Sequence, residues 1–169
     1  YGERWDNVTN ALNALDAAMG QIEYYTKLDT NYLGYFNSPK AAADAGSLIN
    51  LSIDQYTIDS YAYAYIPSQR DYYEQGDVYF TATTQSELSN AYGGGIAFYA
   101  LLHELGHSLG LKHTFDATLT NPSYYQTYMG QFDQSIYTVM SYNATLNSYL
   151  YDFDPQSYMI FDVYVLQAL

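Results

Sequence analysis

The sequence predicts one α+β domain, and three observations support this fold class. Apolar residues near the start recur with a helical spacing, residues in the middle alternate as strands do, and a strongly apolar helix follows a run of glycines. A length of 169 residues suits one domain with a sizeable core and is short for two. We expect a mixed twisted sheet, a long helix that carries the functional site, and an irregular C-terminal part that ends in a helix.

The first expected element is an amphipathic helix. Its apolar residues recur at spacings of four and three, as one buried helix face requires: Val8, Leu12, Leu15, Met19 and Ile22. Asp6 or Asn7 is the expected N-cap. Residues 22–28 are richer in β-forming side chains and favour a short strand after the helix. Residues 29–45 contain glycine, proline and small side chains, which favour irregular structure or a short helix.

Three strands are expected in the middle of the chain. Alternation of apolar and polar residues predicts the first within residues 47–57, although the alternation there is imperfect. The second covers residues 61–66, where tyrosine and alanine alternate, and Pro67 stops it. After a loop, residues 77–81 form the third. Such alternation is typical of strands that bury one face against a core.

Two further helices complete the predicted fold. A glycine run at residues 93–95 precedes a strongly apolar helix that begins near Ile96. Towards the end, Asp154 and Pro155 have the form of an N-cap followed by a proline in the first helical turn. One face of this closing helix would be apolar: Met159, Val163 and Leu166.

The composition excludes several classes of protein. Five Lys and Arg against 18 Asp and Glu give a net charge of −13, which is unsuited to binding nucleic acid or an anionic membrane surface. No apolar run approaches the roughly 20 residues of a membrane span. The absence of cysteine excludes a disulfide scaffold, thiol catalysis and thiolate metal sites. The polar first residues show no signal peptide, so we expect a mature or trimmed chain.

The chain has three histidines, and all of them lie within one short segment. His103 and His107 are four residues apart, so on a helix their imidazoles lie on one face and can reach a single Zn²⁺. A continuing helix would carry His113 away from them, but Gly110 tolerates the positive φ that ends a helix and lets the chain turn back. His113 is then a third ligand. Glu104 is placed to act as the general base on a water at the open fourth position.

Less specific interpretations of these and other residues remain. The histidines could be scattered over a helix end for solubility or packing, but the spacing together with Glu104 and Gly110 makes chance improbable. The glycine run at residues 93–95 lacks the Gly-Lys-Ser/Thr of a phosphate-binding loop and favours a flexible helix entry. Calcium binding is conceivable, but no spacing matches a calcium loop among the candidate acidic residues: Asp71, Asp77, Asp152 and Asp154.

From His103 to His113 the sequence reads His-Glu-x-x-His-x-x-Gly-x-x-His, which resembles the signature of the metzincin zinc endopeptidases. Residues 137–142 resemble the methionine-containing turn beneath the metal of those enzymes. Their Val-Met-Ser-Tyr is similar to the serralysin branch, secreted bacterial proteases that usually carry a calcium-binding repeat domain. Other segments also resemble serralysins: residues 61–67, 76–80, 121–125 and 162–169. The resemblance covers residues 61–169, and the chain lacks the Gly-Gly-x-Gly-x-Asp repeat of the calcium-binding domain.

The resemblance implies an α+β fold of the α/β metzincin type. Residues 1–169 would form a single catalytic domain, with an N-terminal subdomain over 1–109 and a C-terminal subdomain over 110–169. It implies one catalytic zinc ion with three ligands: His103, His107 and His113. Glu104 would be the general acid/base, Met140 an apolar floor under the imidazoles, and Tyr142 a residue that binds zinc at rest and helps to stabilise the oxyanion.

The function expected from these residues is a zinc-dependent endopeptidase, in which Glu104 acts as general base on a zinc-activated water. We expect a secreted monomer that acts on protein or peptide substrates, with a pro-segment or a proteinaceous inhibitor as a further partner. By the same resemblance, the strand near residues 61–65 would be the edge along which a substrate lies. The alternative is a non-catalytic binding or adhesive module of a larger surface protein with a structural zinc site, favoured by the abundance of tyrosine. Glu104 favours the enzyme, since a structural site needs no carboxylate beside an open position.

Overall fold

The computed structural model describes residues 10–57, 59–67, 73–82, 84–88, 95–116, 129–143 and 154–169. Several expected features lie outside these residues, namely Val8, the N-cap Asp6 or Asn7, the first two glycines of the run, Asp71, Asp152 and the segment 121–125. Within the described residues, helices surround a small sheet and no helix is long and apolar enough to cross a membrane.

The three predicted strands form one mixed sheet. They are β1 (Leu51–Asp54), β2 (Ala62–Ala64) and β3 (Val78–Thr81), in the order β1-β3-β2. β1 runs parallel to β3, and β2 runs antiparallel to β3. The mixed sheet confirms the predicted fold class. Each strand is shorter than the segment in which it was expected.

The alternation that predicts the strands corresponds to two faces of the sheet. Ile53, Val78 and Phe80 are almost completely buried and belong to the hydrophobic core. On the other face Tyr63 and Tyr79 stack, with ring centroids 5.0 Å apart. Because successive side chains of a strand point to opposite faces, these tyrosines lie away from the core that Phe80 enters.

Helix α1 (Ala11–Tyr25) is the predicted amphipathic helix. Within the described residues it begins after Asn10, whose positive φ of 63° is not helical. The strand predicted over residues 22–28 is wrong, because Ile22 continues the buried face of the helix. The helix ends at Thr26, whose backbone N–H and side-chain hydroxyl both donate to the Ile22 carbonyl, at 2.9 and 2.7 Å.

Two short helices lie on either side of the strands in the chain. α2 (Pro39–Asp44) confirms the short-helix alternative for residues 29–45. It begins as helix chemistry favours, with the Ser38 hydroxyl accepting from the Ala41 N–H and proline in the first turn. α3 (Gln85–Leu88) was not predicted. Four residues are too few to show a helical period, although Leu88 is completely buried.

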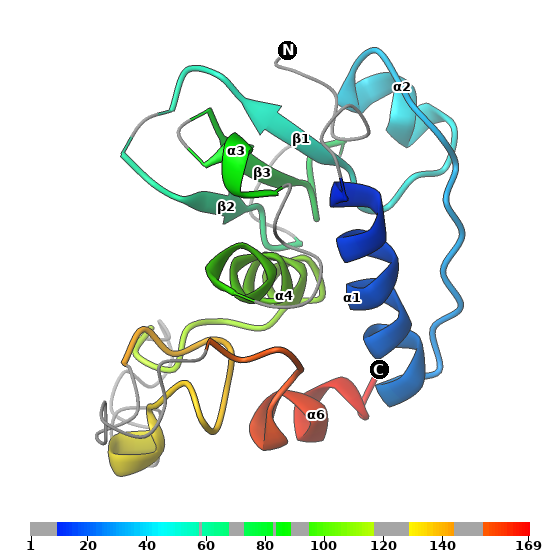
Figure 1. Ribbon diagram of the computed structural model, residues 1–169. Helices are drawn as coiled ribbons and strands as arrows, with labels where there is room; N and C mark the ends of the chain where they lie inside the picture. Colours follow the sequence, from blue (N-terminus) through cyan, green and yellow to red (C-terminus); the bar gives the residue numbers. More distant parts are fainter. Residues whose placement is uncertain are drawn as a thin grey trace.

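Helix α4 (Ile96–Ser108) lies at the centre of the molecule and begins where the sequence predicts. Figure 1 shows α4 end-on, with the sheet on one side, α6 on the other and α1 along its flank. It contacts α1, α3, β2 and β3. Leu101, Leu102 and Leu105 are completely buried. A helix enclosed in this way is apolar almost all round, as its sequence is.

Within the described residues of the C-terminal part, 110–116, 129–143 and 154–169, regular structure before the last helix is short. Its described elements are the single 3₁₀ turn η2 (Gly130–Phe132) and helix α6 (Ile160–Leu166). The predicted start of the last helix at Asp154 and Pro155 is wrong. The Asp162 carboxylate accepts the Met159 N–H at 2.9 Å and so begins the helix at Ile160. α6 contacts α1, and the C-terminus lies beside the end of that helix (Figure 1).

Gly76 is required by its turn, and we expect alanine there to destabilise the fold. Its φ is +83°, and an added Cβ would lie 2.7 Å from the backbone oxygen of Leu48. Gly46 has a similar φ of +89° but open space around the Cβ position, so it is the matched control. Each alanine costs roughly 1–2 kcal/mol of left-handed strain. Urea unfolding should show Gly76→Ala losing at least about 1 kcal/mol more than Gly46→Ala; equal losses would contradict the clash.

Burial of Asp77 should make the free energy of unfolding depend on pH. It is 1% exposed, and burial raises its pKa to about 6, although Asn50 and Tyr79 donate hydrogen bonds to it. The folded chain therefore binds more protons than the unfolded chain between about pH 4 and 6, so this group lowers the free energy of unfolding as pH rises through that window.

Asp77→Asn should remove this contribution, because an amide does not titrate and its oxygen still accepts from Asn50. We expect the stability of the variant relative to the parent to increase between pH 4 and pH 7, by at most about 3 kcal/mol. Urea unfolding of both proteins at several pH values measures the difference. Parallel pH profiles would show that Asp77 titrates normally.

Candidate metal centre

Helix α4 ends in a turn that depends on Gly110. The φ of Gly110 is +95°, as predicted for a glycine that ends this helix. Its N–H donates to the His107 carbonyl at 2.9 Å, and the Leu111 N–H donates to the Gly106 carbonyl at 3.0 Å. These two bonds form the Schellman arrangement, which reverses the chain direction at a helix end. The reversal brings the segment that contains His113 back to the two helical histidines.

The structure brings the three predicted histidines together. The Nε2 atom of His113 lies 3.1 Å from Nε2 of His103 and 3.1 Å from Nε2 of His107. The ligand atoms of the three side chains all lie within 4.8 Å of one another. Zinc held tetrahedrally at about 2.0–2.1 Å places two of its nitrogen ligands roughly 3.3 Å apart. The spacing of the three nitrogens therefore fits one metal ion.

Hydrogen bonds determine which nitrogen of each helical histidine faces the centre. Nδ1 of His103 lies 2.6 Å from the Val139 carbonyl oxygen, and Nδ1 of His107 lies 2.8 Å from the Leu111 carbonyl oxygen. A carbonyl only accepts, so both Nδ1 atoms carry the proton and both Nε2 atoms present a lone pair. Lone pairs that converge repel one another unless a cation lies between them. This donor set fits the zinc ion that the sequence predicts.

Burial favours the neutral form of these imidazoles. It lowers the pKa of His103 to about 4, and it also lowers the pKa of His107. Both side chains are therefore neutral at pH 7 in the metal-free protein. Neutral imidazole is the form that coordinates a metal, so no proton has to be removed from either side chain before binding.

Glu104 is the one buried side chain in the described part with an unpaired polar atom. It is 7% exposed, and its Oε2 atom has no hydrogen-bond partner. Burial raises its pKa to about 8. An unpaired carboxylate oxygen costs free energy in the interior, and such sites are typically explained by a ligand or by catalysis. Glu104, the residue whose side chain carries this unpaired oxygen, is also the residue that the sequence predicts to be the general base.

Met140 packs against the helix between the two histidines. It is 2% exposed, and a Cβ added to Gly106 would lie 2.9 Å from its sulfur atom. Gly106 therefore leaves room for the methionine at this point of α4. The role of Met140 as an apolar floor under the imidazoles stays a prediction.

Tyr142 lies beside the histidines but remains open to solvent. Its ring centroid is 4.7 Å from that of His113 and 5.5 Å from that of His103, and the residue is 67% exposed. Burial, followed by the charges of Glu104 and Asp116, raises its pKa. The phenol is therefore protonated at neutral pH in the metal-free protein. The structure brings it to the centre, while its predicted role stays a prediction.

Asp162 supports the methionine turn, and sequence reasoning did not assign it a role. Its carboxylate accepts from the Thr138 hydroxyl at 2.6 Å and from the Val139 N–H at 2.8 Å. The carbonyl of Val139 is the group that orients His103. α6 therefore reaches the metal centre through one buried carboxylate. A single aspartate within the apolar run Ile160–Leu166 is the sequence signal that could have found it.

Asp133 connects the segments that carry His113 and Tyr142, and no sequence pattern predicts this connection. It accepts a short hydrogen bond from the hydroxyl of Thr114, which follows His113 in the chain. It also accepts from the side-chain amide of Asn143 at 2.8 Å. Thr114 is buried and Asn143 is exposed. One carboxylate thus ties together the segments that carry the third histidine and the tyrosine.

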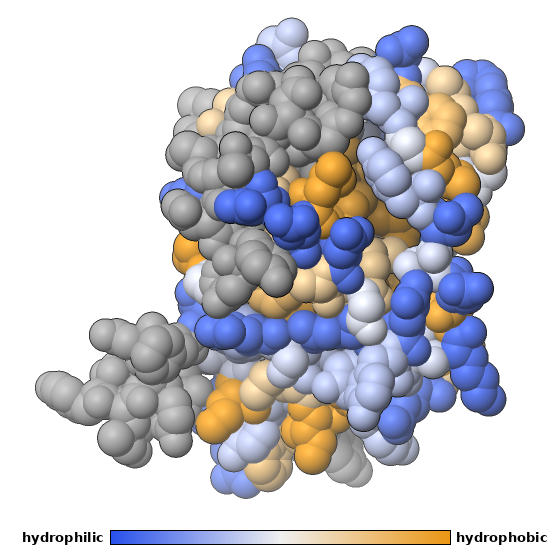
Figure 2. All heavy atoms as spheres, turned by 45° about the vertical axis from the view of Figure 1, so that its right-hand side comes forward, coloured by the Kyte–Doolittle hydropathy of each residue, from blue (hydrophilic) through white to orange (hydrophobic). Residues whose placement is uncertain are grey.

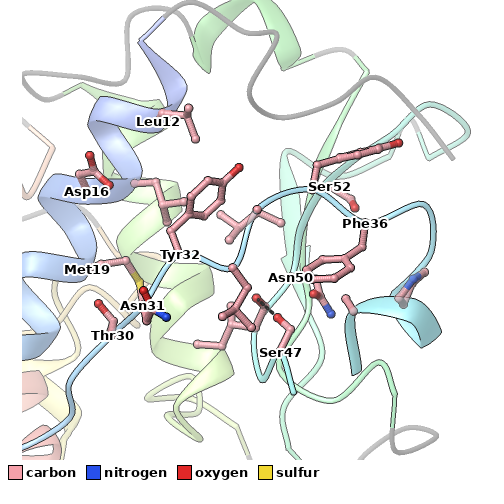
Figure 3. Close-up of a pocket in the computed structure, with 18 of the residues that line it drawn as sticks. Leu12, Asp16, Met19, Thr30, Asn31, Tyr32, Phe36, Ser47, Asn50 and Ser52 are labelled. Atoms are coloured by element: carbon pink, nitrogen blue, oxygen red, sulfur yellow. Dashed lines mark hydrogen bonds between the residues drawn. The ribbon is translucent and has the colours of Figure 1, made fainter. Parts of the chain in front are cut away.

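A cavity of about 550 Å³ is formed by other parts of the chain, between α1, the connection that follows it, and β1. In Figure 3, Leu12 and Met19 of α1 lie on one side, Asn50 and Ser52 on the other, and Tyr32 between them. Figure 2 shows apolar side chains gathered in a hollow on the face that it brings forward. None of the lining residues belongs to the histidine group. The candidate metal site is therefore identified by the three histidine nitrogens and not by the size of this cavity.

Comparison with known proteins gives two kinds of match. The model of metallo-peptidase family M12 matches residues 6–153. Two proteins named serralysin, from Photorhabdus laumondii and from a Photorhabdus species (strain Az29), are each 32% identical to this chain over 93 residues. Each alignment covers 53% of this chain and 19% of the relative. The chain therefore spans about a fifth of the length of the curated relatives it matches.

The contact between Asp133 and Asn143 can be tested by exchanging the two residues. Asp133→Asn places two amides face to face, and Asn143→Asp places two carboxylates face to face, so each should lower the free energy of unfolding by roughly 0.5–1.5 kcal/mol. The double variant restores an amide–carboxylate pair and should regain most of the loss. A double-mutant cycle in urea measures the coupling. Additive losses would show that the pair does not interact.

Proposed function

The chain belongs to metallo-peptidase family M12, and we propose that it is a zinc-dependent endopeptidase that hydrolyses peptide bonds in protein substrates. This membership confirms the predicted resemblance to metzincin-like zinc metalloproteases. The observation that carries the proposal is the convergence of three histidine nitrogens in the segment that also holds the unpaired oxygen of Glu104. The partial similarity to the two serralysins supports a serralysin-like enzyme.

Three imidazoles would hold the zinc ion through Nε2: those of His103, His107 and His113. When bound, zinc polarises a carbonyl and increases the acidity of water at neutral pH. The protein contributes a fixed orientation of the ligands. The Val139 and Leu111 carbonyls hold two rings by their Nδ1–H groups, so those rings cannot turn away from the metal.

Glu104 would move the proton in the reaction. Its Oε2 atom has no competing hydrogen bond, so it is free to accept a proton from the attacking water. The leaving amine nitrogen would then take the same proton from the carboxyl group. Burial of the carboxyl group keeps bulk water from exchanging the proton during the step.

Tyr142 and strand β2 would both contact the substrate. The phenol of Tyr142 is exposed beside His113 and would donate a hydrogen bond to the oxyanion of the tetrahedral intermediate. In the absence of substrate, the same phenol would coordinate the zinc ion. β2 is an edge of the described sheet and contacts α4, so its free edge would pair with an extended substrate backbone.

We also infer that residues 1–169 act as one catalytic domain, secreted and monomeric, with subdomains over 1–109 and 110–169. The end of α4 at Ser108 and the turn at Gly110 support a boundary there. A pro-segment or a proteinaceous inhibitor would cover the metal centre. Calcium has no support among the described residues, since the carboxylate of Asp77 is taken up by Asn50 and Tyr79.

The test is hydrolysis of an unfolded generic protein by the zinc-loaded chain and by Glu104→Ala. Removal of the general base should lower kcat/KM by about 10²–10⁴-fold while leaving zinc bound at one ion per chain. A chelator should abolish cleavage, and added zinc should restore it. Asp59→Ala, at an exposed position, is the matched control and should cleave as the parent does.

Two outcomes would overturn the proposal. Cleavage that survives both the chelator and Glu104→Ala would come from a contaminant and not from this site. A chain that holds one zinc ion and cleaves no protein or peptide library would be a binding module with a structural metal.

A further inference from the structure

His113 depends on its own turn for its position, unlike the other two histidines. His103 and His107 are buried on α4, and helix geometry fixes the distance between them. His113 lies on an irregular segment beyond the end of the helix, and a fifth of its side chain is exposed. A ligand on such a segment loses more conformational freedom on binding a metal unless another group orients it first.

Asp116 supplies that orientation through one oxygen atom. Oδ2 of Asp116 lies 3.2 Å from Nδ1 of His113 and 3.2 Å from the backbone nitrogen of the same residue. The Asp116 N–H in turn donates to the His113 carbonyl at 3.1 Å. The carboxylate therefore caps the turn through the backbone and lies beside Nδ1 of the ring, on the side opposite Nε2.

The faces of the imidazole are also covered by aromatic rings. Phe115 stacks on His113 with a centroid distance of 4.7 Å and an interplanar angle of 6°. The Tyr142 ring meets the same imidazole at 62°. Phe115 on one face of the ring and Asp116 beside Nδ1 both favour the orientation that His113 has here.

The partner of His113 differs in charge from those of the other two histidines. Neutral backbone carbonyls accept from Nδ1 of His103 and Nδ1 of His107. A carboxylate beside Nδ1 makes the opposite nitrogen a stronger electron donor than a carbonyl does. We propose that Asp116 is a positioning residue that raises the zinc affinity of the centre by orienting and polarising His113. This inference rests on the proposed function only in that the three histidines bind zinc.

The experiment measures the zinc dissociation constant of the metal-free chain by competition with a chromogenic chelator. Asp116→Ala should weaken zinc binding by about 10–100-fold. Asp116→Asn keeps an acceptor oxygen without the charge and should have a smaller effect. Asp44→Ala, which removes an exposed ion pair with Lys40, is the control and should bind zinc as the parent does.

A double-mutant cycle shows whether Asp116 acts through His113. Asp116→Ala should weaken binding in the parent but cause no further loss in a His113→Ala background. A carboxylate that merely attracts the cation through space would weaken binding equally in both backgrounds, and that result would overturn the proposal.

A merely structural role is separated by thermal unfolding. Asp116→Ala should leave the Tm of the metal-free chain close to that of the parent but reduce the rise in Tm on adding zinc. If Asp116→Ala does not fold, Asp116→Asn takes its place in every comparison. A folded variant with unchanged zinc affinity overturns this inference alone. A parent chain that binds no zinc overturns the proposed function as well.

Discussion

Burial of the last two turns of α4 is the constraint on which the rest of the structure depends. From Leu101 to Ser108 every residue of the helix is buried, and this stretch includes two histidines, a glutamate and a serine. The leucines need that burial to form the core, but the polar side chains lose water with them. Each polar group must then find a partner inside the protein or remain at a cost. The partners it finds determine the chemistry of the centre.

His107 and Ser108 find their partners nearby, in the Leu111 and Glu104 carbonyls, whereas His103 is held by a distant segment. The Val139 carbonyl holds His103, and Asp162 of α6 holds the turn that presents this carbonyl. Tyr99 and Tyr158 donate to the Ser141 and Leu102 carbonyls, which ties the helix to the C-terminal part. Hydrogen bonds to α4 and its neighbours thus hold the described segments of the C-terminal part in place.

Glu104 is the exception, and the exception suits catalysis. The same burial that makes the helical histidines neutral leaves one oxygen of Glu104 without a partner. A metal ion in the centre would repay part of that cost, because a cation favours ionised Glu104. The burial that is unfavourable for the metal-free chain at this residue is therefore the burial on which its proposed role as general base depends. Active sites commonly combine such unfavourable burial with function.

Sequence patterns predicted the long elements better than the short ones. The apolar period located α1, and the apolar run after the glycines located α4. β-propensity failed at residues 22–28, where Ile22 extends the buried face of α1. The cap signal failed at Asp154 and Pro155, because Asp162 caps the helix later. The four residues of α3 were too few for any period.

Features that depend only on neighbours in the chain could be predicted from the residues alone. The spacing of His103 and His107 along a helix and the positive φ of Gly110 follow from local backbone geometry, and both were predicted. Only the tertiary structure decided which groups complete the centre. Asp162 and Asp133 reach it from remote segments, and nothing in their local sequence names their hydrogen-bond partners. A helical period is repeated along the backbone, whereas a hydrogen bond between distant segments exists only once the core has packed.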